Sequence, residues 1–240
     1  KTPFVIAELS GNHNGKIDNV FKLIDKAKIA KADAIKIQTY SPDTITLNSS
    51  NKDFIITKGP WAGKRLYDLY KEAHTPYEWH KNIFDYAKDQ KIKIFSSPFS
   101  EFDVDFLEEL GCEAFKVASF EITHLPLIKH LAKKKKPILL STGMASLNEI
   151  TEAVDLIKKH SKEEFAMLHC VSGYPSLPEE ANLNKMLFLE KTFKCKIGLS
   201  DHCMDNIVAT IATSLGAQII EKHITLNRSD GGVDSGFSLE

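Results

Sequence analysis

The sequence has few cysteines, no long apolar run and almost no net charge. Its four cysteines show no CxxC spacing, so we expect reduced thiols and no disulfide framework: Cys112, Cys170, Cys195 and Cys203. No stretch approaches the roughly 18 consecutive apolar residues of a membrane helix, and the first residues lack the layout of a signal peptide. A formal charge of -1 and a pI near 6.8 provide no excess of positive charge for binding nucleic acid. We therefore expect a cytoplasmic protein that binds neither membrane nor nucleic acid.

The chain instead carries eight short apolar runs that alternate with helical patterns. The runs expected to form strands are 4–9, 34–39, 92–97, 114–119, 137–142, 166–171, 196–201 and 219–224. The segments with helical spacing are 20–32, 76–89, 101–110, 125–132, 147–160, 183–193 and 205–215. Strand followed by helix, repeated, predicts parallel strands with right-handed crossovers. Over 240 residues with 42% hydrophobic content, this pattern predicts one α/β domain, a (β/α)8 TIM barrel. An open doubly wound sheet is the alternative, but its GxGxxG fingerprint is absent.

Nearly all of these strands end in polar or ionisable residues. The groups are Glu8; Lys36 with Gln38; Ser96 with Ser97; Lys116 with Ser119; Ser141 with Thr142; Ser200, Asp201 and His202; and Glu221 with His223. The sixth strand, which leads to Ser172, shows the pattern more weakly. A strand buried on both faces should be apolar, and the carboxyl ends of parallel strands meet at one end of a barrel. The sequence therefore predicts an active site at that end.

Two segments depart from the regular alternation. Residues 40–74 form a long connection that contains Trp61, and such a length is typical of a lid or binding loop, with a surface insertion as the alternative. A glycine-rich tail, 229–236, stands where an eighth helix is expected. We therefore expect residues 1–240 to be a barrel that lacks its last helix, within a longer protein.

Two histidines at neighbouring strand ends favour a metal site. His202 and His223 are placed to converge on one divalent ion, with positions left for water or substrate. Imidazole suits zinc, iron, cobalt or manganese, and the pattern does not choose among them.

Lys36 and Lys116 lie inside otherwise apolar strands, where a buried ammonium needs an anion. Nearby hydroxyl groups favour a cradle for a small phosphorylated anion. Internal ion pairs with carboxylates are the alternative, and the candidates are Glu8, Glu121 and Glu221. Glu8 itself is either an acid or base of the site or a plain salt-bridge partner of Lys36.

The residues also carry a family resemblance. Segments in register along the whole chain resemble the sialic acid synthase family: FVIAELSGNHNG, ADAIKIQTYSPDTIT, IFSSPFS, AFKVASFE, ILLSTGM, HCVSGYPS, IGLSDHC and IIEKHITLNRSDGGVDSGFSLE. The resemblance implies condensation of phosphoenolpyruvate with an acylated amino-sugar on a (β/α)8 barrel that holds a divalent metal. It also implies a small antifreeze-like lid domain, expected after Glu240.

Within this family, KGPWAGKRLYDLY and GGVDSGFSLE resemble the pseudaminic acid synthase branch. Ser172 stands where neuraminate-type members often carry Asn, and Trp61 lies in the loop that reaches the sugar. Both features favour a 2,4-diacetamido-2,4,6-trideoxy hexose as acceptor, with neuraminate or legionaminate synthesis as the alternative.

Residue by residue, the resemblance implies three sets of roles. Phosphoenolpyruvate is held by Lys36, Ser97, Lys116, Ser119, Ser141 and Ser200. Gln38, Ser172, Tyr174 and Asp234 face the sugar, while Glu8, Lys116 and His223 are catalytic. The metal is held by His202 and His223, with Mn²⁺ expected and Mg²⁺ or Co²⁺ as alternatives.

The resemblance further implies a homodimer in which each lid covers the partner's barrel. Two rival functions stay open at this stage. A metal-dependent aldolase or epimerase on the same fold would share the histidines and lysines, and a barrel kept only for binding would be expected to lose some of them.

Overall fold

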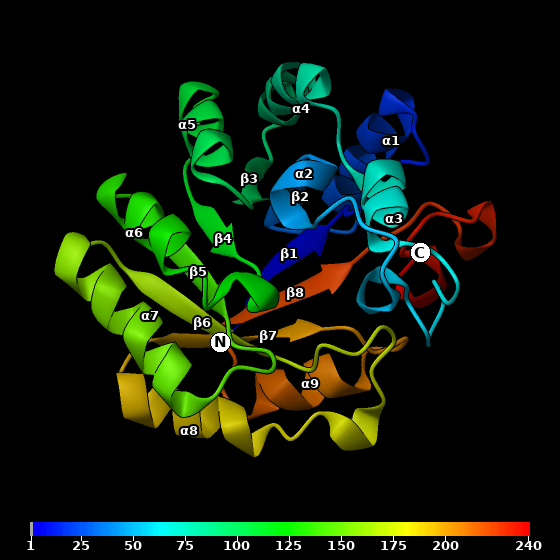
Figure 1. Ribbon diagram of the computed structural model, residues 1–240. Coiled ribbons are helices and arrows are strands. Elements are labelled where there is room, and N and C mark those ends of the chain that lie inside the picture. Colours follow the sequence, from blue (N-terminus) through cyan, green and yellow to red (C-terminus); the bar gives the residue numbers. More distant parts are fainter. Residues whose placement is uncertain (1) are drawn as a thin grey trace.

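A computed structural model describes residues 2–240 as a closed barrel of eight parallel strands, hydrogen-bonded in sequence order (Figure 1). The strands are β1 (Phe4–Glu8), β2 (Ala34–Thr39), β3 (Lys93–Pro98), β4 (Phe115–Val117), β5 (Ile138–Ser141), β6 (Phe165–Cys170), β7 (Lys196–Asp201) and β8 (Ile219–His223). Pairing of β1 with β8 closes the ring and sets Glu8 beside His223. The predicted (β/α)8 barrel is thereby confirmed.

Helices surround the barrel and cover the outer face of the strands. They are α1 (Ile17–Ile29), α4 (Tyr77–Asp89), α5 (Glu101–Glu109), α6 (Leu125–Lys133), α7 (Leu147–His160), α8 (Asn184–Phe193) and α9 (Ile207–Ser214). Their apolar faces follow the helical period; in α1 the buried residues are Val20, Leu23, Ile24 and Ala27. Helix α7 is capped by Ser146, whose hydroxyl accepts a hydrogen bond from the Glu149 amide while the Glu149 carboxylate accepts one from the Ser146 amide.

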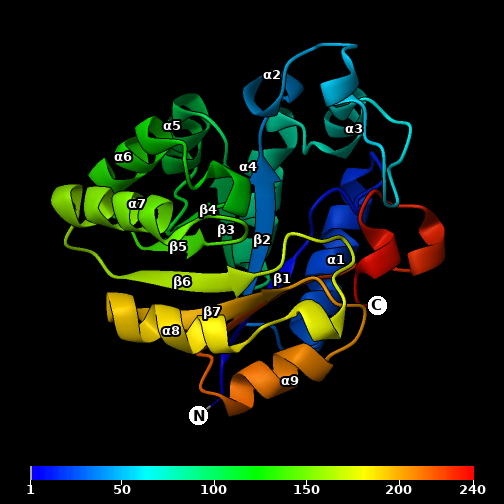
Figure 2. The same ribbon diagram turned by 60° about the horizontal axis from the view of Figure 1, so that its bottom comes forward.

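The long connection after β2 is more ordered than the sequence predicted. It contains α2 (Pro42–Ile45), a short 3-10 turn (Lys52–Phe54) and α3 (Leu66–Ala73). Figure 2 shows α2 and α3 beyond the end of β2, so this segment builds one wall of the barrel mouth. These helices were missed because short helices depend on tertiary packing, here through buried Leu69 and Ala73, more than on local periodicity.

Two strand ends also differ from the prediction. Strand β4 stops at Val117, and Ser119 opens a 3-10 turn, Ser119–Glu121, that turns into the mouth. After β8 the described chain forms two 3-10 turns, Arg228–Asp230 and Ser235–Phe237. It then returns beside β8, where the Thr225 amide donates to the Leu239 carbonyl at 2.7 Å.

The two ends of the barrel differ in character. The amino-terminal end holds an apolar cavity of about 730 Å³, lined by side chains that include Phe4, Phe95 and Ile138. The carboxyl-terminal end holds the buried ionisable groups described below. In residues 2–240, no helix is long and apolar enough to cross a membrane.

Candidate active site

Four oppositely charged side chains from four strands meet inside the carboxyl-terminal end of the barrel. Lys36 Nζ lies 2.5 Å from Glu8 Oε2 and 3.7 Å from Glu221 Oε1. Lys116 Nζ donates to both oxygens of Glu221, at 2.9 and 3.1 Å. All four side chains are buried, so their charges are shielded from water and must balance one another.

The two carboxyl groups of this cluster have opposite pKa shifts. Burial raises the pKa of Glu8, an effect that the ammonium of Lys36 only partly offsets. Burial also opposes ionisation of Glu221, but the charges of Lys116 and Lys36 prevail and lower its pKa to about 2. Glu221 is therefore held as a carboxylate, while Glu8 is the more easily protonated of the pair.

The pKa values of the two lysines also shift in opposite directions. Burial disfavours the charge of Lys36, yet the carboxylates of Glu221 and Glu8 raise its pKa above the usual value. Burial lowers the pKa of Lys116, which Glu221 offsets only in part. The internal ion pairs considered from the sequence thus exist with Glu8 and Glu221, whereas Glu121 lies against His124, at 3.3 Å.

His202 and His223 lie beside this cluster with their ring centroids 5.5 Å apart. His202 Nδ1 donates to the carbonyl of Val171 at 2.7 Å, which leaves Nε2 with its lone pair. His223 Nδ1 is buried and has no hydrogen-bond partner. Burial lowers the pKa of His202 to about 4 and that of His223 well below the usual value. Both rings are therefore neutral, the form that binds a metal.

Hydroxyl groups line the wall around Lys36 and Lys116. Lys36 Nζ donates to Ser97 Oγ at 3.3 Å, and Ser200 Oγ donates to Glu221 Oε1 at 2.9 Å. The hydroxyls of Ser119 and Ser172 lie 3.1 Å apart, in contact across two loops. Buried hydroxyl groups without a partner are rare, yet Ser141 Oγ and Thr142 Oγ1 have none in the described chain.

Gly143 packs directly against the side chains of Ser119 and Ser172. A Cβ atom at Gly143 would lie 2.4 Å from Ser119 Cβ and 2.8 Å from Ser172 Oγ, and the glycine φ angle is +39°. Only glycine fits this position, which keeps the loops after β4, β5 and β6 close together. The chain thus gathers hydroxyl groups, two of them without a partner, near two buried lysines, which is the chemistry of an anion site.

Asp234 reaches the mouth from the loop after β8. Its carboxylate accepts a hydrogen bond from Ser10 Oγ, its amide donates to Asn12 Oδ1 at 3.1 Å, and its Oδ2 lies 3.8 Å from His223 Nδ1. Burial raises the pKa of Asp234 to about 6. The β1 loop therefore holds this carboxyl group next to the histidine pair.

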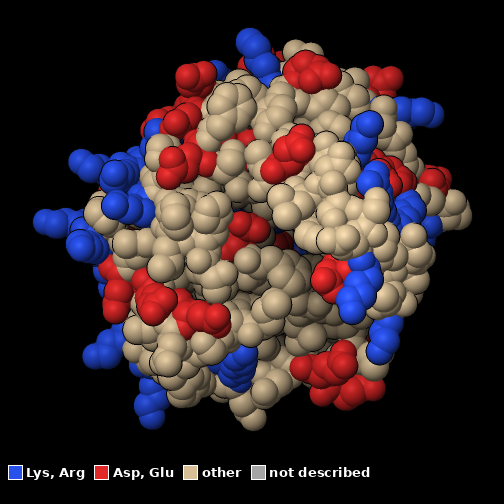
Figure 3. Space-filling model, in the orientation of Figure 1, with Lys and Arg blue, Asp and Glu red and all other residues tan. Residues whose placement is uncertain are grey.

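Gln38 and Tyr174 complete the set of residues that the sequence assigned to the site. Gln38 follows Lys36 by two positions on β2, so both face the barrel interior, with Gln38 nearer the mouth. The Tyr174 ring lies 4.4 Å from His202 and 6.4 Å from His223. The face that contains the mouth is hollowed near its centre, with acidic side chains in and beside the hollow (Figure 3).

Comparison with known proteins identifies the family. The model of the NeuB family matches residues 23–240. The chain is 45% identical to pseudaminic acid synthase of Campylobacter jejuni serotype O:2, over all of this chain and 70% of that protein. It is 43% identical to pseudaminic acid synthase of Helicobacter pylori, over 99% of this chain and 70% of that protein.

The chain belongs to the NeuB family. A solved NeuB-like structure agrees with this assignment: N-acetylneuraminic acid synthetase of Leptospira borgpetersenii, in complex with citrate, superimposes with a TM-score of 0.89 at 34% identity. The match covers all of this chain and 79% of that one. The resemblance inferred from the sequence segments is thereby confirmed at the family level.

The geometry of this NeuB-family site shows which of the polar residues at the ends of β7 and β8 join the cluster and which do not. Asp201 does not join the histidines, because alternation along β7 turns it outward to Lys222, at 2.7 Å. Glu221 was considered only as a counter-ion, yet it contacts Lys116, Ser200 and Lys36 and is the centre of the cluster. The sequence does indicate this role for Glu221, because a residue two positions before His223 on the same strand faces the same barrel interior.

Two of the four cysteines, Cys170 and Cys203, are buried near the strand ends that carry the site. Cys170 and Cys203 follow the pattern of strand ends beside histidines, but burial raises the pKa of both thiols. All four cysteines are free, as the sequence predicted. Those two behave as small buried side chains.

Proposed function

We propose that this chain is the barrel of a nonulosonic acid synthase that condenses phosphoenolpyruvate with a 2,4-diacetamido-2,4,6-trideoxy hexose. With one water, the products are pseudaminic acid and inorganic phosphate. The observation that carries the proposal is the joint presence of two buried lysines, two carboxyl groups of opposite pKa shift and two neutral histidines at one barrel mouth. Its specific substrate rests on the 45% identity to a pseudaminic acid synthase.

The anion site would hold phosphoenolpyruvate. Lys36 and Lys116 supply positive charge, and donors come from Ser97, Ser119, Ser141 and Ser200. The two lysines are paired with Glu8 and Glu221. A phosphate or carboxylate of the substrate would compete for the ammonium groups and would meet the Ser141 hydroxyl, which has no other partner.

His202 and His223 would hold a divalent cation, with Mn²⁺ favoured and Mg²⁺ or Co²⁺ as alternatives. Their neutral rings, and the unpaired Nδ1 of buried His223, fit that role. Within residues 2–240 no three His, Cys, Asp or Glu side chains gather as a metal-binding group, so water and substrate would supply the other ligands. A bound cation would polarise the aldehyde of the acceptor.

The reaction then needs one carbon–carbon bond and one hydration. C3 of phosphoenolpyruvate attacks the aldehyde carbon, whose oxygen takes a proton, and C2 becomes an oxocarbenium-like centre. Water adds at C2 and gives up a proton, and the tetrahedral species loses phosphate by cleavage of the C2–O bond. The positive charge that develops at C2 would be stabilised by a carboxylate close to it.

The opposite pKa shifts divide these tasks between Glu8 and Glu221. A carboxyl group whose pKa is raised by burial suits transfer of the water proton, whereas one held ionised by two lysines suits stabilisation of positive charge. We therefore assign proton transfer to Glu8, and we place Gln38, Ser172, Tyr174 and Asp234 at the sugar.

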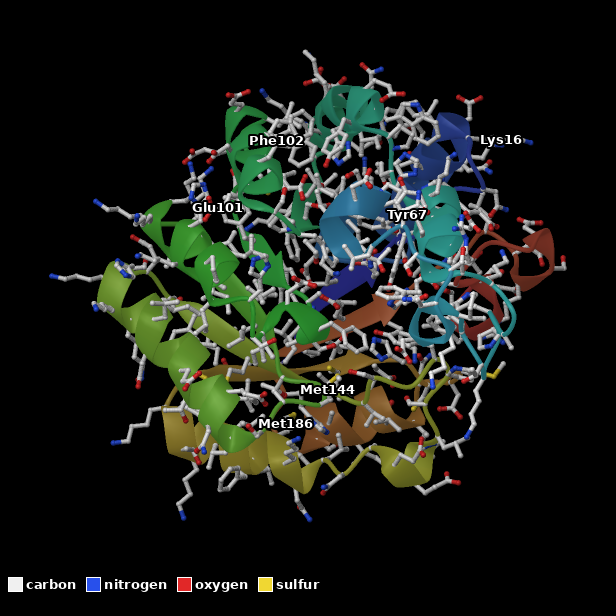
Figure 4. All side chains as sticks on the ribbon, viewed as in Figure 1. Lys16, Tyr67, Glu101, Phe102, Met144 and Met186 are labelled. Carbon is white, nitrogen blue, oxygen red and sulfur yellow. The ribbon has the colours of Figure 1, made fainter. Side chains whose placement is uncertain are left out.

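A lid over the mouth and a homodimer that exchanges it are part of the proposal. Most exposed large apolar side chains of the described residues lie at this end of the barrel, in loops or first helical turns: Leu47, Phe102, Phe120, Met144, Leu147, Leu177, Met204 and Ile207. Met144 and Tyr67 project on different sides of the mouth (Figure 4). An apolar rim around a polar site is typical of a surface that another domain covers.

The test is an assay of phosphate release from phosphoenolpyruvate with Mn²⁺ and a panel of acylamino sugars. We expect release only with an acceptor, and fastest with the trideoxy diacetamido sugar. Preference for N-acetylmannosamine or for the legionaminate precursor would redirect the assignment within the family. Carbon–carbon bond formation without release of phosphate would instead indicate an aldolase.

A further inference from the structure

The connection after β2 presents Trp61 at the tip of a β-hairpin. Ile55 and Arg65 form an antiparallel bridge, and the Ile56 amide donates to the Lys64 carbonyl at 2.9 Å. Gly59 and Gly63 have φ angles of +81° and +88°, which close the turn around Trp61. The hairpin therefore fixes the place of this indole.

The indole is anchored to the loop that carries Asp234. Trp61 Nε1 donates to the Val233 carbonyl at 2.7 Å. Its ring centroid lies 5.8 Å from that of Tyr174 and 6.4 Å from that of Phe237. Tyr174 in turn packs on His202, at 4.4 Å, and Phe237 lies 5.2 Å from His223. Three separate segments thus form one aromatic wall beside the histidine pair.

Apart from the Tyr174 hydroxyl, this wall offers almost no hydrogen-bonding group to a ligand. The single donor of Trp61 is used by Val233, and Phe237 has none. A sugar hydroxyl held against the Trp61 and Phe237 rings would lose water without gaining a hydrogen-bond partner, whereas a methyl group needs none.

We propose that Trp61 is a specificity-determining residue of this enzyme, whose indole face binds the deoxy, methyl-bearing end of the acceptor sugar. The inference rests on the function proposed above. The aldehyde end of the sugar lies at the histidines, and the wall runs from His202 through Tyr174 to Trp61. Trp61 therefore meets the end of the open-chain sugar that is farthest from the aldehyde.

The first test compares two acceptors that differ only at C6, one with a methyl group and one with a hydroxymethyl group. For Trp61→Ala, kcat/KM for the methyl acceptor is expected to fall about 10- to 100-fold, and that for the hydroxymethyl acceptor by much less. Trp61→Phe keeps an apolar face and loses the hydrogen bond to Val233, so it should retain most of the preference. The KM for phosphoenolpyruvate should stay unchanged in both variants.

An equal loss for both acceptors, in Trp61→Ala and Trp61→Phe alike, would overturn the proposal. It would show that Trp61 only positions the loop of Asp234 through its hydrogen bond. A preference that survives in Trp61→Ala would overturn it as well.

A binding measurement separates this inference from the proposed reaction. In the Trp79→Phe variant, Trp61 is the single remaining tryptophan, because the chain has two. We expect its fluorescence to change on titration with the methyl acceptor, at lower concentrations than with the hydroxymethyl acceptor. Such a change without phosphate release would support the inference and refute the proposed function. No change with either sugar would overturn the inference, whatever the activity.

Discussion

At the scale of single residues, two buried lysines, one inside the barrel and one outside it, allow a controlled test of the proposed anion site. Lys116 lies inside the barrel against Glu221, and Lys222 lies outside it against Asp201. Both are buried and paired with a carboxylate, but only Lys116 faces the proposed anion site. Lys116→Met should weaken phosphoenolpyruvate binding by about 1.5 to 3 kcal/mol, roughly 10- to 150-fold, because a charge-assisted contact is lost.

Calorimetric titration with phosphoenolpyruvate, with thermal unfolding of the same samples, measures this difference. Lys222→Met should lower the stability, since Asp201 is left buried without its counter-ion, yet keep the affinity. Equal affinities in the wild type and Lys116→Met would make Lys116 a structural ion-pair partner only.

The histidine pair supports a second prediction at this scale. His202→Ala and His223→Ala should each abolish Mn²⁺-dependent turnover and Mn²⁺ binding, because each deletes one of two ligands. The unfolding temperature should stay close to that of the wild type, since both side chains lie at strand ends. His169→Ala, a buried histidine of β6 that donates to the Ala181 carbonyl, is the control. Wild-type activity that is equal in chelator and in Mn²⁺ would contradict the metal assignment.

Sequence reasoning found most of these residues for a simple reason. Lys36, Lys116 and Glu8 are charged side chains within apolar runs, and burial of such groups is costly without a function or a partner. The contacts of Glu221 were not predictable in the same way, because they depend on which carboxylate the closed barrel places between the two lysines. The outward position of Asp201, by contrast, follows from the two-residue period of β7, along which Ser200 faces inward.

At the scale of elements, a buried histidine connects β2, β3 and α4. His80 Nδ1 donates to the Pro76 carbonyl at 3.0 Å, and its Nε2 lies 2.9 Å from Thr39 Oγ1, which is 2.6 Å from Ser96 Oγ. Burial lowers the pKa of His80 to about 4, from an ordinary value of 6.5. The folded protein therefore prefers the neutral ring, and the unfolded chain binds the proton first as the pH falls.

This linkage predicts that the stabilisation from neutral His80 is complete above pH 6.5 and is lost as the pH falls toward 4. The slope from this group is at most about 1.4 kcal/mol per pH unit. Urea unfolding at several pH values should show a shallower loss in His80→Gln than in the wild type. Identical pH slopes for the two proteins would contradict the contribution of His80.

The elements themselves were predictable to different degrees. All eight strands and the seven covering helices follow apolar periods that the sequence displays, so their order was sufficient to predict the barrel. Helices α2 and α3 were not predictable from the sequence, because short helices gain their stability from contacts with distant segments. The hairpin of Trp61 was missed for the same reason: its anchor, Val233, is distant in the sequence.

At the scale of the whole molecule, the barrel separates its stability from its chemistry. The apolar core lies between strands and helices, while the ionisable cluster occupies the carboxyl-terminal mouth beneath an apolar rim. This arrangement allows the loops at the mouth to determine which substrate binds, while the barrel holds the ionisable groups.

The central claim is that this site cleaves the C–O bond of phosphoenolpyruvate after joining its C3 to an aldehyde. Phosphoenolpyruvate labelled with ¹⁸O at the oxygen between C2 and phosphorus tests it directly, with the trideoxy diacetamido sugar and Mn²⁺ present. Mass spectrometry of the released phosphate should find the label retained in it, because that oxygen leaves with phosphorus. Unlabelled phosphate would show P–O cleavage and would contradict the account.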